Sequence, residues 1–337
     1  MLIAGVVQIA MQVPVLARCG VSIRPAWQTH SEAFRKIIIL IGPMILGLTV
    51  TQINTLADDL IAWWFSGSAE KGISFMLLGR EILYPLGRGS VSHLYFSQRL
   101  YQLPLGVFGI SLATAIFPIM SSASARKDFA ELGKTVSRGL CACIFISIPA
   151  TVGLVVIAKP LIALAFQHGQ FSGKDTDMVA WTLLFYALGL CGYFSQQVVT
   201  RAFYSMQDSK TPMTSALTAV AANIALNLVL IWFLGTGGLA LSTALCSYLQ
   251  VGILAVMLRR QLGSAIFEGL AVTLAKTIAA TLLMSAAILI TVWLSRSWPN
   301  VFKLALVVPA AAAVYLAAAK ILGVEALSVF AGGKKDT

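Results

Sequence analysis

Long runs of apolar residues recur along this chain, and they constrain its fold more than any other feature of the sequence. A bilayer has a hydrocarbon core about 30 Å thick, which a helix crosses with roughly 20 apolar residues. Nine runs, each separated from the next by a short polar stretch, can be marked: Leu2–Leu16, Ile37–Phe65, Val91–Met120, Leu140–Ala158, Met178–Thr200, Pro212–Leu234, Gly238–Leu258, Leu270–Leu294 and Val301–Ile321. Because 58% of the residues are hydrophobic and only 11% are charged, water is not the main solvent of this chain. We therefore predict an all-α, polytopic transmembrane bundle of about nine spans, of which the first is short for a full crossing.

Three segments predict departures from straight, simple spans. Pro43 and Pro104 interrupt the second and third runs, which are longer than a straight span, so we expect kinked or tilted helices there. The segment from Arg126 to Arg138 mixes charges with apolar residues, which is typical of an interfacial helix or a connector.

The distribution of Lys and Arg among the loops predicts the orientation. One set of alternate loops, counted with the C-terminal tail, holds 15 of the 24 basic residues, and the opposite set holds 7. Cytoplasmic loops carry such an excess, so we expect loop 126–138 inside the cell and loop 66–90 outside. The same count places the N-terminus outside and the C-terminus inside. Because such an N-terminus would need translocation without a targeting signal, we expect further helices to precede this segment.

The polar residues exclude several classes of function. The net charge of +11 is spread over many loops, whereas a nucleic-acid surface requires clustered basic residues, so we expect no nucleic-acid partner. Five cysteines lie in or beside apolar runs without a CxxC pair, and three histidines are scattered. No Ser/His/Asp, paired-acid or metal-ligand pattern appears, so we expect no enzyme activity, no metal site and no cofactor.

Ionisable residues at bilayer depth are costly, so each is a candidate for function. Asp58 and Asp59 follow a polar stretch, Thr49 to Thr55, that contains Gln52 and Asn54. Adjacent residues on a helix point about 100° apart, so one carboxylate can face a cavity while the other approaches the interface. The alternative is that both lie near the outer headgroups and only end the span.

Arg99 is the second candidate, and Gln98 and Gln102 lie beside it on the helix. A guanidinium offers a planar fork of donors that suits a phosphate or pyrophosphate group. The two glutamines make a polar stripe that favours a water-lined surface, while an arginine that snorkels to the headgroups remains the alternative. Lys276 lies only a turn into its helix, and we expect it to snorkel to cytoplasmic lipid.

A series of short motifs resembles the MurJ (MviN) lipid II flippases, and their order and spacing together are specific. The resemblance covers almost the whole chain and fades after about Leu270. The motifs are Gly5–Gln8 with Gln12–Pro14 and Arg18–Gly20, Gly42–Gly47, Gln52–Asn54 with Asp58, Gly89–Ser92, Arg99–Leu100 with Leu103–Pro104, Gly106–Gly109, Phe117–Ser121, Phe166–Phe171 and Phe203–Pro212.

The resemblance implies a fold in which fourteen helices form two six-helix lobes and a final pair, and in which the lobes rock to give alternating access. The runs of this chain would be the sixth to the fourteenth helix. On that basis residues 1–36 are the last helix of a missing first lobe with a cytoplasmic linker. Residues 37–262 are then the second lobe, residues 263–323 the C-terminal helix pair, and residues 324–337 a cytoplasmic tail.

The resemblance also implies a function and a site. It predicts a flippase for lipid II, or a similar polyprenyl-pyrophosphate glycolipid, in peptidoglycan synthesis at the bacterial inner membrane. Membrane lipids, and cell-wall synthesis enzymes as further candidates, would be its partners. Arginines of the family's central cavity bind the anionic head of lipid II, Arg99 matches one of those positions, and the final helix pair holds the polyprenyl tail. The predicted substrate-binding residues are Arg99, Asp58, Gln52, Asn54, Gln98 and Gln102, with Asp58 facing inward and with Asp58 and Arg99 on an open polar face.

Three features depart from the family pattern. The first lobe is absent, about twenty residues from Ser68 to Arg88 are inserted between two motif blocks, and Gln98 and Gln102 stand where some members carry carboxylates. The last difference weakens an ion-coupling role at those positions.

Two alternative functions remain open. One is export of another lipid-linked oligosaccharide or of drugs within the same superfamily, the multidrug/oligosaccharidyl-lipid/polysaccharide exporters. The other is a truncated protein that does not transport.

Overall fold

The computed structural model of the chain describes residues 5–6, 10–14, 18, 31–68, 71–77, 80–295 and 298–326. The chain divides into two units, Met1–Gly42 and Pro43–Thr337. The described part of the first unit is helical and includes the first turns of α2 (Glu32–Trp64), which carry the acidic Glu32. The predicted first run, Leu2–Leu16, lies largely outside the described residues.

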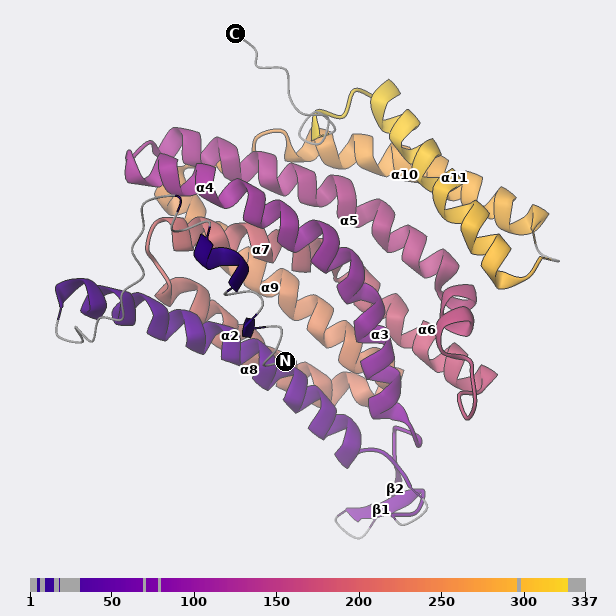
Figure 1. Cartoon of the computed structure of the whole chain (residues 1–337). Coiled ribbons are helices and arrows are strands. Elements are labelled where there is room, and N and C mark those ends of the chain that lie inside the picture. Colours follow the sequence, from indigo (N-terminus) through magenta and orange to yellow (C-terminus); the bar gives the residue numbers. More distant parts are fainter. Residues whose placement is uncertain are drawn as a thin grey trace. The chain divides into compact units, whose positions relative to one another are not determined.

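The second unit consists mainly of long helices, as predicted (Figure 1). Among the described residues, six helices are long and apolar enough to cross a membrane, and a bent pair adds a seventh candidate. The elements after α2 are β1 (Ser74–Leu77), β2 (Arg80–Leu83), α3 (Ser90–Pro104), the π-helical η1 (Leu105–Ile110), α4 (Ser111–Ala125), α5 (Phe129–Phe166), α6 (Gly173–Leu188), α7 (Leu190–Ser205), α8 (Lys210–Leu234), α9 (Thr236–Leu262), the short 3-10 helix η2 (Ser264–Phe267), α10 (Leu270–Leu294) and α11 (Asn300–Ile321). Each predicted run from the second to the ninth therefore contains a long helix or helix pair.

Pro104 interrupts its span, as predicted, and the irregularity is a π-helical turn. A proline lacks the backbone N–H and displaces the preceding turn, so the hydrogen-bond ladder has to be rearranged. The Arg201 guanidinium on α7 donates to the Ile110 carbonyl at 2.9 Å, which supplies a partner at the end of η1. By contrast, α2 continues through Pro43 without a change of helix type.

The bent pair α6 and α7 forms the fifth predicted run, and its two halves meet at Gly189 with a 43° bend. A Cβ atom at Gly189 would lie 2.6 Å from the Tyr193 hydroxyl oxygen. Because Tyr193 is buried and stacks on Tyr101 with ring centroids 5.0 Å apart, it has little room to move away. The close approach at the bend therefore requires glycine.

The prediction of an interfacial helix or connector at 126–138 was wrong for most of that segment. Only a short turn separates α4 from α5, which begins at Phe129 behind the N-cap Asp128, whose carboxylate accepts from the Glu131 amide at 2.9 Å. Leu132 and Val136 lie one turn apart and are fully buried. Their packing into the bundle makes this segment the first turns of α5.

The insertion at 68–88 contains the two described strands of the chain. β1 and β2 pair antiparallel, with Phe75 opposite Ile82 and Met76 opposite Glu81. The sequence predicted a loop here, because the run is too short and too mixed in character to separate a hairpin from irregular structure.

Several helix ends meet at the end of the unit that carries the hairpin. The His93 imidazole on α3 lies 2.9 Å from the Asp175 carboxylate near the start of α6. The turn between α8 and α9 lies at the same end of the unit, because a Cβ atom added at Gly235 would lie 3.6 Å from the Leu86 side chain.

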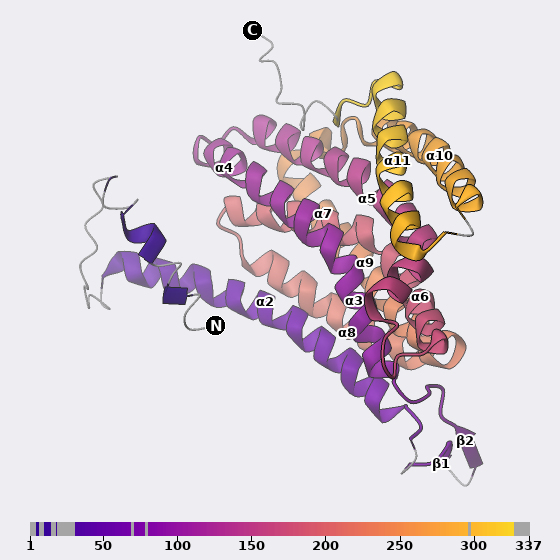
Figure 2. The same cartoon turned by 45° about the vertical axis from the view of Figure 1, so that its right-hand side comes forward.

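The last two helices form a core of their own with α5 (Figure 2). The Tyr315 hydroxyl on α11 donates to the Phe145 carbonyl on α5 at 2.5 Å, and the two rings lie 5.2 Å apart. Lys276 of α10 donates to the Gly323 carbonyl at 2.8 Å, just past the end of α11. The structure thus gives Lys276 a partner within the protein, where the sequence predicted snorkelling to lipid.

Candidate functional site

A buried polar cluster surrounds Asp58 where α2, α8 and α9 meet. Asp58 is 1% exposed, although it lies within an apolar helix. Asn227 on α8 donates to Asp58 Oδ1 at 2.5 Å, and Thr243 on α9 donates to Oδ2 at 3.1 Å. Asn54, one turn earlier on α2, donates to Oδ2 at 3.4 Å. Each carboxylate oxygen therefore has a donor from a different helix, which compensates part of the cost of burying it.

A second layer of side chains holds these donors. Asn227 is fully buried, and its side-chain amide donates to Asn223 Oδ1 one turn before it. The Ser242 hydroxyl donates to the side-chain Oδ1 of Asn227. Asn223 also lies 3.2 Å from the Thr243 hydroxyl. All of these groups offer oxygen atoms, the ligand type that hard cations take, and Asp58 supplies the negative charge. The arrangement also ties α2 to α8 and α9 within a single hydrogen-bonded network.

Asp58 and Asn54 were predicted from the sequence, whereas the cluster residues on α8 and α9 were not. Asn223 and Asn227 stand at i and i+4 in an otherwise apolar run, so they share one helical face. An amide side chain within an apolar span is a candidate for a structural or functional contact, as a charged side chain is, because an unpaired amide in hydrocarbon is also costly.

A second polar group lies on α3, inside the apolar span Ser90–Ala125. Arg99 is exposed, its guanidinium donates to Gln102 Oε1 at 3.1 Å, and it lies 4.7 Å from the centre of the Tyr95 ring. These contacts hold the guanidinium along the helix surface. The fork still has donors to offer to an anion, because one hydrogen bond uses only one of its five N–H groups.

Gln98 points to a different side of α3. It is half-buried, and its amide donates to the Tyr186 hydroxyl at 3.1 Å. The Tyr186 and Tyr101 rings pack in a tilted arrangement with centroids 4.8 Å apart, and Tyr101 stacks on Tyr193. Gln98 therefore joins α3 to α6 through the Tyr186 hydroxyl. Arg99 is exposed and donates to the half-buried Gln102.

The structure divides the predicted site residues between these environments. Asp58 and Asn54 share the buried cluster, and Asp58 is the inward carboxylate, as predicted, while Asp59 is only partly buried. Gln52 is exposed on α2. The expectation that Asp58 lies with Arg99 on an open polar face was wrong for Asp58, because α8 and α9 cover its carboxylate.

Comparison with known proteins gives one family over most of the chain. Residues 1–309 match the model of the family described as lipid II flippase MurJ. A probable lipid II flippase MurJ of Vibrio cholerae is 35% identical over 252 residues, which cover 75% of this chain and 44% of that protein. A probable lipid II flippase MurJ of Haemophilus influenzae is 29% identical over 338 residues, which cover 96% of this chain and 61% of that protein. This chain thus spans about half the length of the curated relatives it matches.

Solved structures agree on the fold. A lipid II flippase MurJ in an inward closed conformation superposes with a TM-score of 0.65 at 24% identity, covering 88% of this chain and 56% of that one. A eukaryotic MATE transporter superposes with a TM-score of 0.56 at 16% identity, and the match covers 85% of this chain and 65% of that one. At these identities the likeness establishes the helical arrangement alone.

Proposed function

This chain belongs to the family of the lipid II flippase MurJ, and on that premise we propose that it forms part of a transporter for a lipid-linked peptidoglycan precursor. The transporter would move lipid II, or a similar polyprenyl-pyrophosphate glycolipid, across the bacterial inner membrane by alternating access, without making or breaking a bond in it. The pyrophosphate and sugars need a polar path, while the polyprenyl tail stays in lipid.

One observation carries the proposal beyond family membership. Arg99 lies nine residues into α3, about 14 Å from its start at 1.5 Å per residue, and it is exposed there beside Gln102. An exposed guanidinium at that depth in an apolar span is costly in lipid unless it faces water or an anion. A pyrophosphate head supplies the anion, and it matches the planar fork of the guanidinium.

The remaining parts follow from the same premise. Residues 37–262 would form one six-helix lobe, with residues 1–36 joining it to another lobe. Residues 263–323 would form the helix pair that holds the tail, and the shared core of α10, α11 and α5 supports such a unit. Residues 324–337 would be a cytoplasmic tail. In this arrangement Asp58, Asn54 and Gln98 position helices of the lobe, while Arg99, Gln102 and the exposed Gln52 are left to contact substrate.

The transport proposal is tested in cells depleted of their own lipid II flippase. A full-length protein that carries this segment should restore externally accessible lipid-linked precursor, measured by an enzyme or label that acts only at the outer leaflet. A matched full-length protein with a deletion in the segment, present in the membrane at the same level, is the control. Absence of accessible precursor in cells that contain the intact protein would refute transport of this lipid.

The orientation is tested separately. The 15 to 7 division of basic residues places Lys134 in the cytoplasm and Arg88 outside, with the N-terminus outside and the C-terminus inside. Both side chains are exposed, so a cysteine at either position can react. In intact cells an impermeant thiol reagent should label Arg88→Cys and should label Lys134→Cys only after permeabilisation. The opposite pattern would reverse the orientation.

A further inference from the structure

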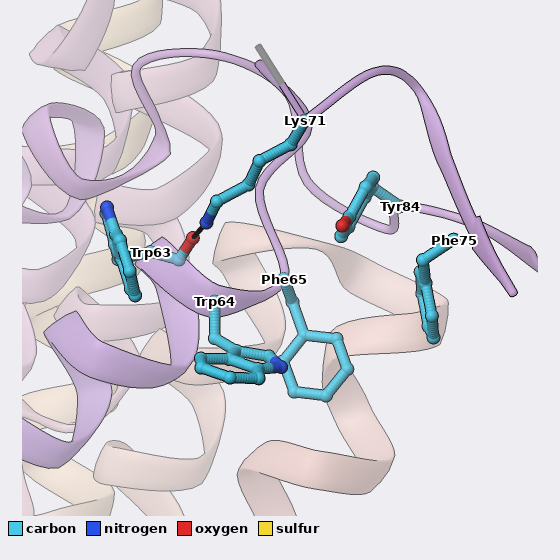
Figure 3. A pocket seen from close by; sticks show the side chains of 6 residues that line it. All are labelled: Trp63, Trp64, Phe65, Lys71, Phe75 and Tyr84. Carbon is cyan, nitrogen blue, oxygen red and sulfur yellow. Dashed lines mark hydrogen bonds between the residues drawn. The ribbon is translucent and has the colours of Figure 1, made fainter. Parts of the chain in front are cut away.

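An aromatic pocket joins the end of α2 to the inserted hairpin (Figure 3). Its volume is about 320 Å³. Three consecutive aromatic residues at the end of α2, the last of them just past the helix, form one wall, and the hairpin segment contributes the other. The lining consists of Trp63, Trp64, Phe65, Lys71, Phe75 and Tyr84. Phe75 and Tyr84 face each other with ring centroids 5.0 Å apart, and Phe65 packs edge-on against Trp232 of α8 at 5.8 Å. Phe75 also packs edge-on against Phe65 with ring centroids 6.5 Å apart, so the hairpin wall contacts the end of α2.

Lys71 is the polar group of this pocket. Its ammonium donates to the Trp63 carbonyl at 3.1 Å and lies 3.8 Å from the centre of the Trp63 ring. Figure 3 shows this hydrogen bond. The carbonyl is at the C-terminal end of α2, where the helix dipole favours a cation. An ammonium has three donors, and the hydrogen bond to the Trp63 carbonyl uses one of them. The pocket therefore presents a fixed positive charge, which repels cationic ligands and attracts anions.

The surroundings of the pocket are apolar where a water-facing loop would be polar. Trp63, Trp64, Ile73, Met76 and Leu83 are between 55% and 77% exposed. All five lie at or beyond the end of α2, on the segment that leads back to α3. Loops in water rarely gather such side chains, and an isolated two-stranded hairpin is only marginally stable. At a membrane surface the same side chains lie in the headgroup region, where Trp and Tyr are enriched.

We propose that the hairpin lies in the membrane interface and that its aromatic pocket binds the phosphate of an anionic phospholipid at Lys71. The ammonium pairs with the phosphate, and the ring faces and the exposed Ile73, Met76 and Leu83 cover the glycerol and the first acyl carbons. On the proposed orientation this lipid belongs to the outer leaflet. The site lies outside the α3 group and the Asp58 cluster, and it requires only that α2 and α3 span the membrane.

Tryptophan quenching by lipid measures this binding directly. The full chain is placed in nanodiscs of phosphatidylcholine with a rising fraction of phosphatidylglycerol, either of which can be brominated on its acyl chains. The quenching seen in the parent chain but not in Trp64→Phe comes from Trp64, and this difference measures lipid bound at the pocket. We expect half-maximal quenching at a clearly lower fraction of brominated phosphatidylglycerol than of brominated phosphatidylcholine, because one lysine near the surface favours an anionic lipid about five-fold.

Variants of the lysine separate charge from general effects on the surface. Lys71→Gln should need about five-fold more phosphatidylglycerol, whereas Lys71→Arg, which keeps the charge, should stay within about two-fold of the parent. Lys174→Gln, another exposed lysine of the predicted outer loops, should leave the titration unchanged. Equal quenching by the two lipids in the parent chain would overturn the proposal, as would an equal shift in the Lys174 variant. So would displacement of the lipid by inorganic phosphate alone, which would make the pocket a site for a soluble anion.

Discussion

Arg99→Ala in a full-length protein that carries this segment should lower the appearance of lipid-linked precursor on the outer leaflet by about a hundred-fold or more. A guanidinium fork makes two charge-assisted hydrogen bonds to a pyrophosphate, each worth roughly 1.5–3 kcal/mol, and every 1.4 kcal/mol is about ten-fold in binding. The variant should still insert normally, because removing a charge from a helix interior lowers the cost of insertion.

Arg99→Lys separates charge from geometry. Lysine keeps the charge but loses the planar fork, so we expect activity between that of the arginine and alanine forms. Arg138→Ala, which removes an exposed arginine near the start of α5, is the matched control and should transport normally. The readout is precursor accessible at the outer leaflet at equal protein levels. Full transport by the alanine variant would remove Arg99 from the substrate site.

Asn227→Leu should destabilise the helical unit by about 3 kcal/mol, because it leaves the buried Asp58 carboxylate without its 2.5 Å donor. Neutral hydrogen bonds within membrane proteins contribute only about 0.6 kcal/mol on average. A loss near 3 kcal/mol would therefore indicate that the Asn227 partner is a charged carboxylate. Asn54→Leu is the matched control. Its contact with Asp58 is 3.4 Å long and its side chain is only half-buried, so we expect a loss of about 1 kcal/mol or less.

A double-mutant cycle identifies the carboxylate as the cause. In an Asp58→Asn background, Asn227→Leu should cost only about 1 kcal/mol, since a neutral amide loses less than a buried charge when its donor is removed. Reversible unfolding of the purified chain in detergent gives each free energy. Equal costs of Asn227→Leu in the two backgrounds would show that packing, and not the charge, accounts for the effect.

The positions of the helices could be predicted from the sequence alone. In hydrocarbon the backbone has to satisfy its own hydrogen bonds, and the bilayer thickness sets the length of a span, so composition within a window of about 20 residues decides the element. The runs from Pro212 to Ile321 correspond to α8 through α11 for this reason. The inward direction of Asp58 was also predicted, from the family motif together with the 100° offset between neighbouring helical residues.

Local composition cannot tell where a helix ends when packing extends it. Residues 126–138 were predicted as an interfacial helix or connector because their charges resemble those of a surface helix. Residues 129–138 instead belong to α5, where Leu132 and Val136 are fully buried. The hairpin at 74–83 was missed for the opposite reason. Its pairing depends on strand register and on aromatic contacts with the end of α2, and neither produces a clear period in so short a segment.

The sequence by itself determined that this chain is a helical membrane protein and which of its ionisable residues stand inside apolar runs, because both follow from its composition within windows of helix length. Only the tertiary structure decided which of those charges are enclosed. Asp58 is paired with Asn227, 169 positions later, and with Thr243, 185 positions later. Arg99 finds its partners within one turn of its own helix and stays exposed. Burial is a property of which helices pack together, and the local periodicity of one segment does not show which distant segment covers it.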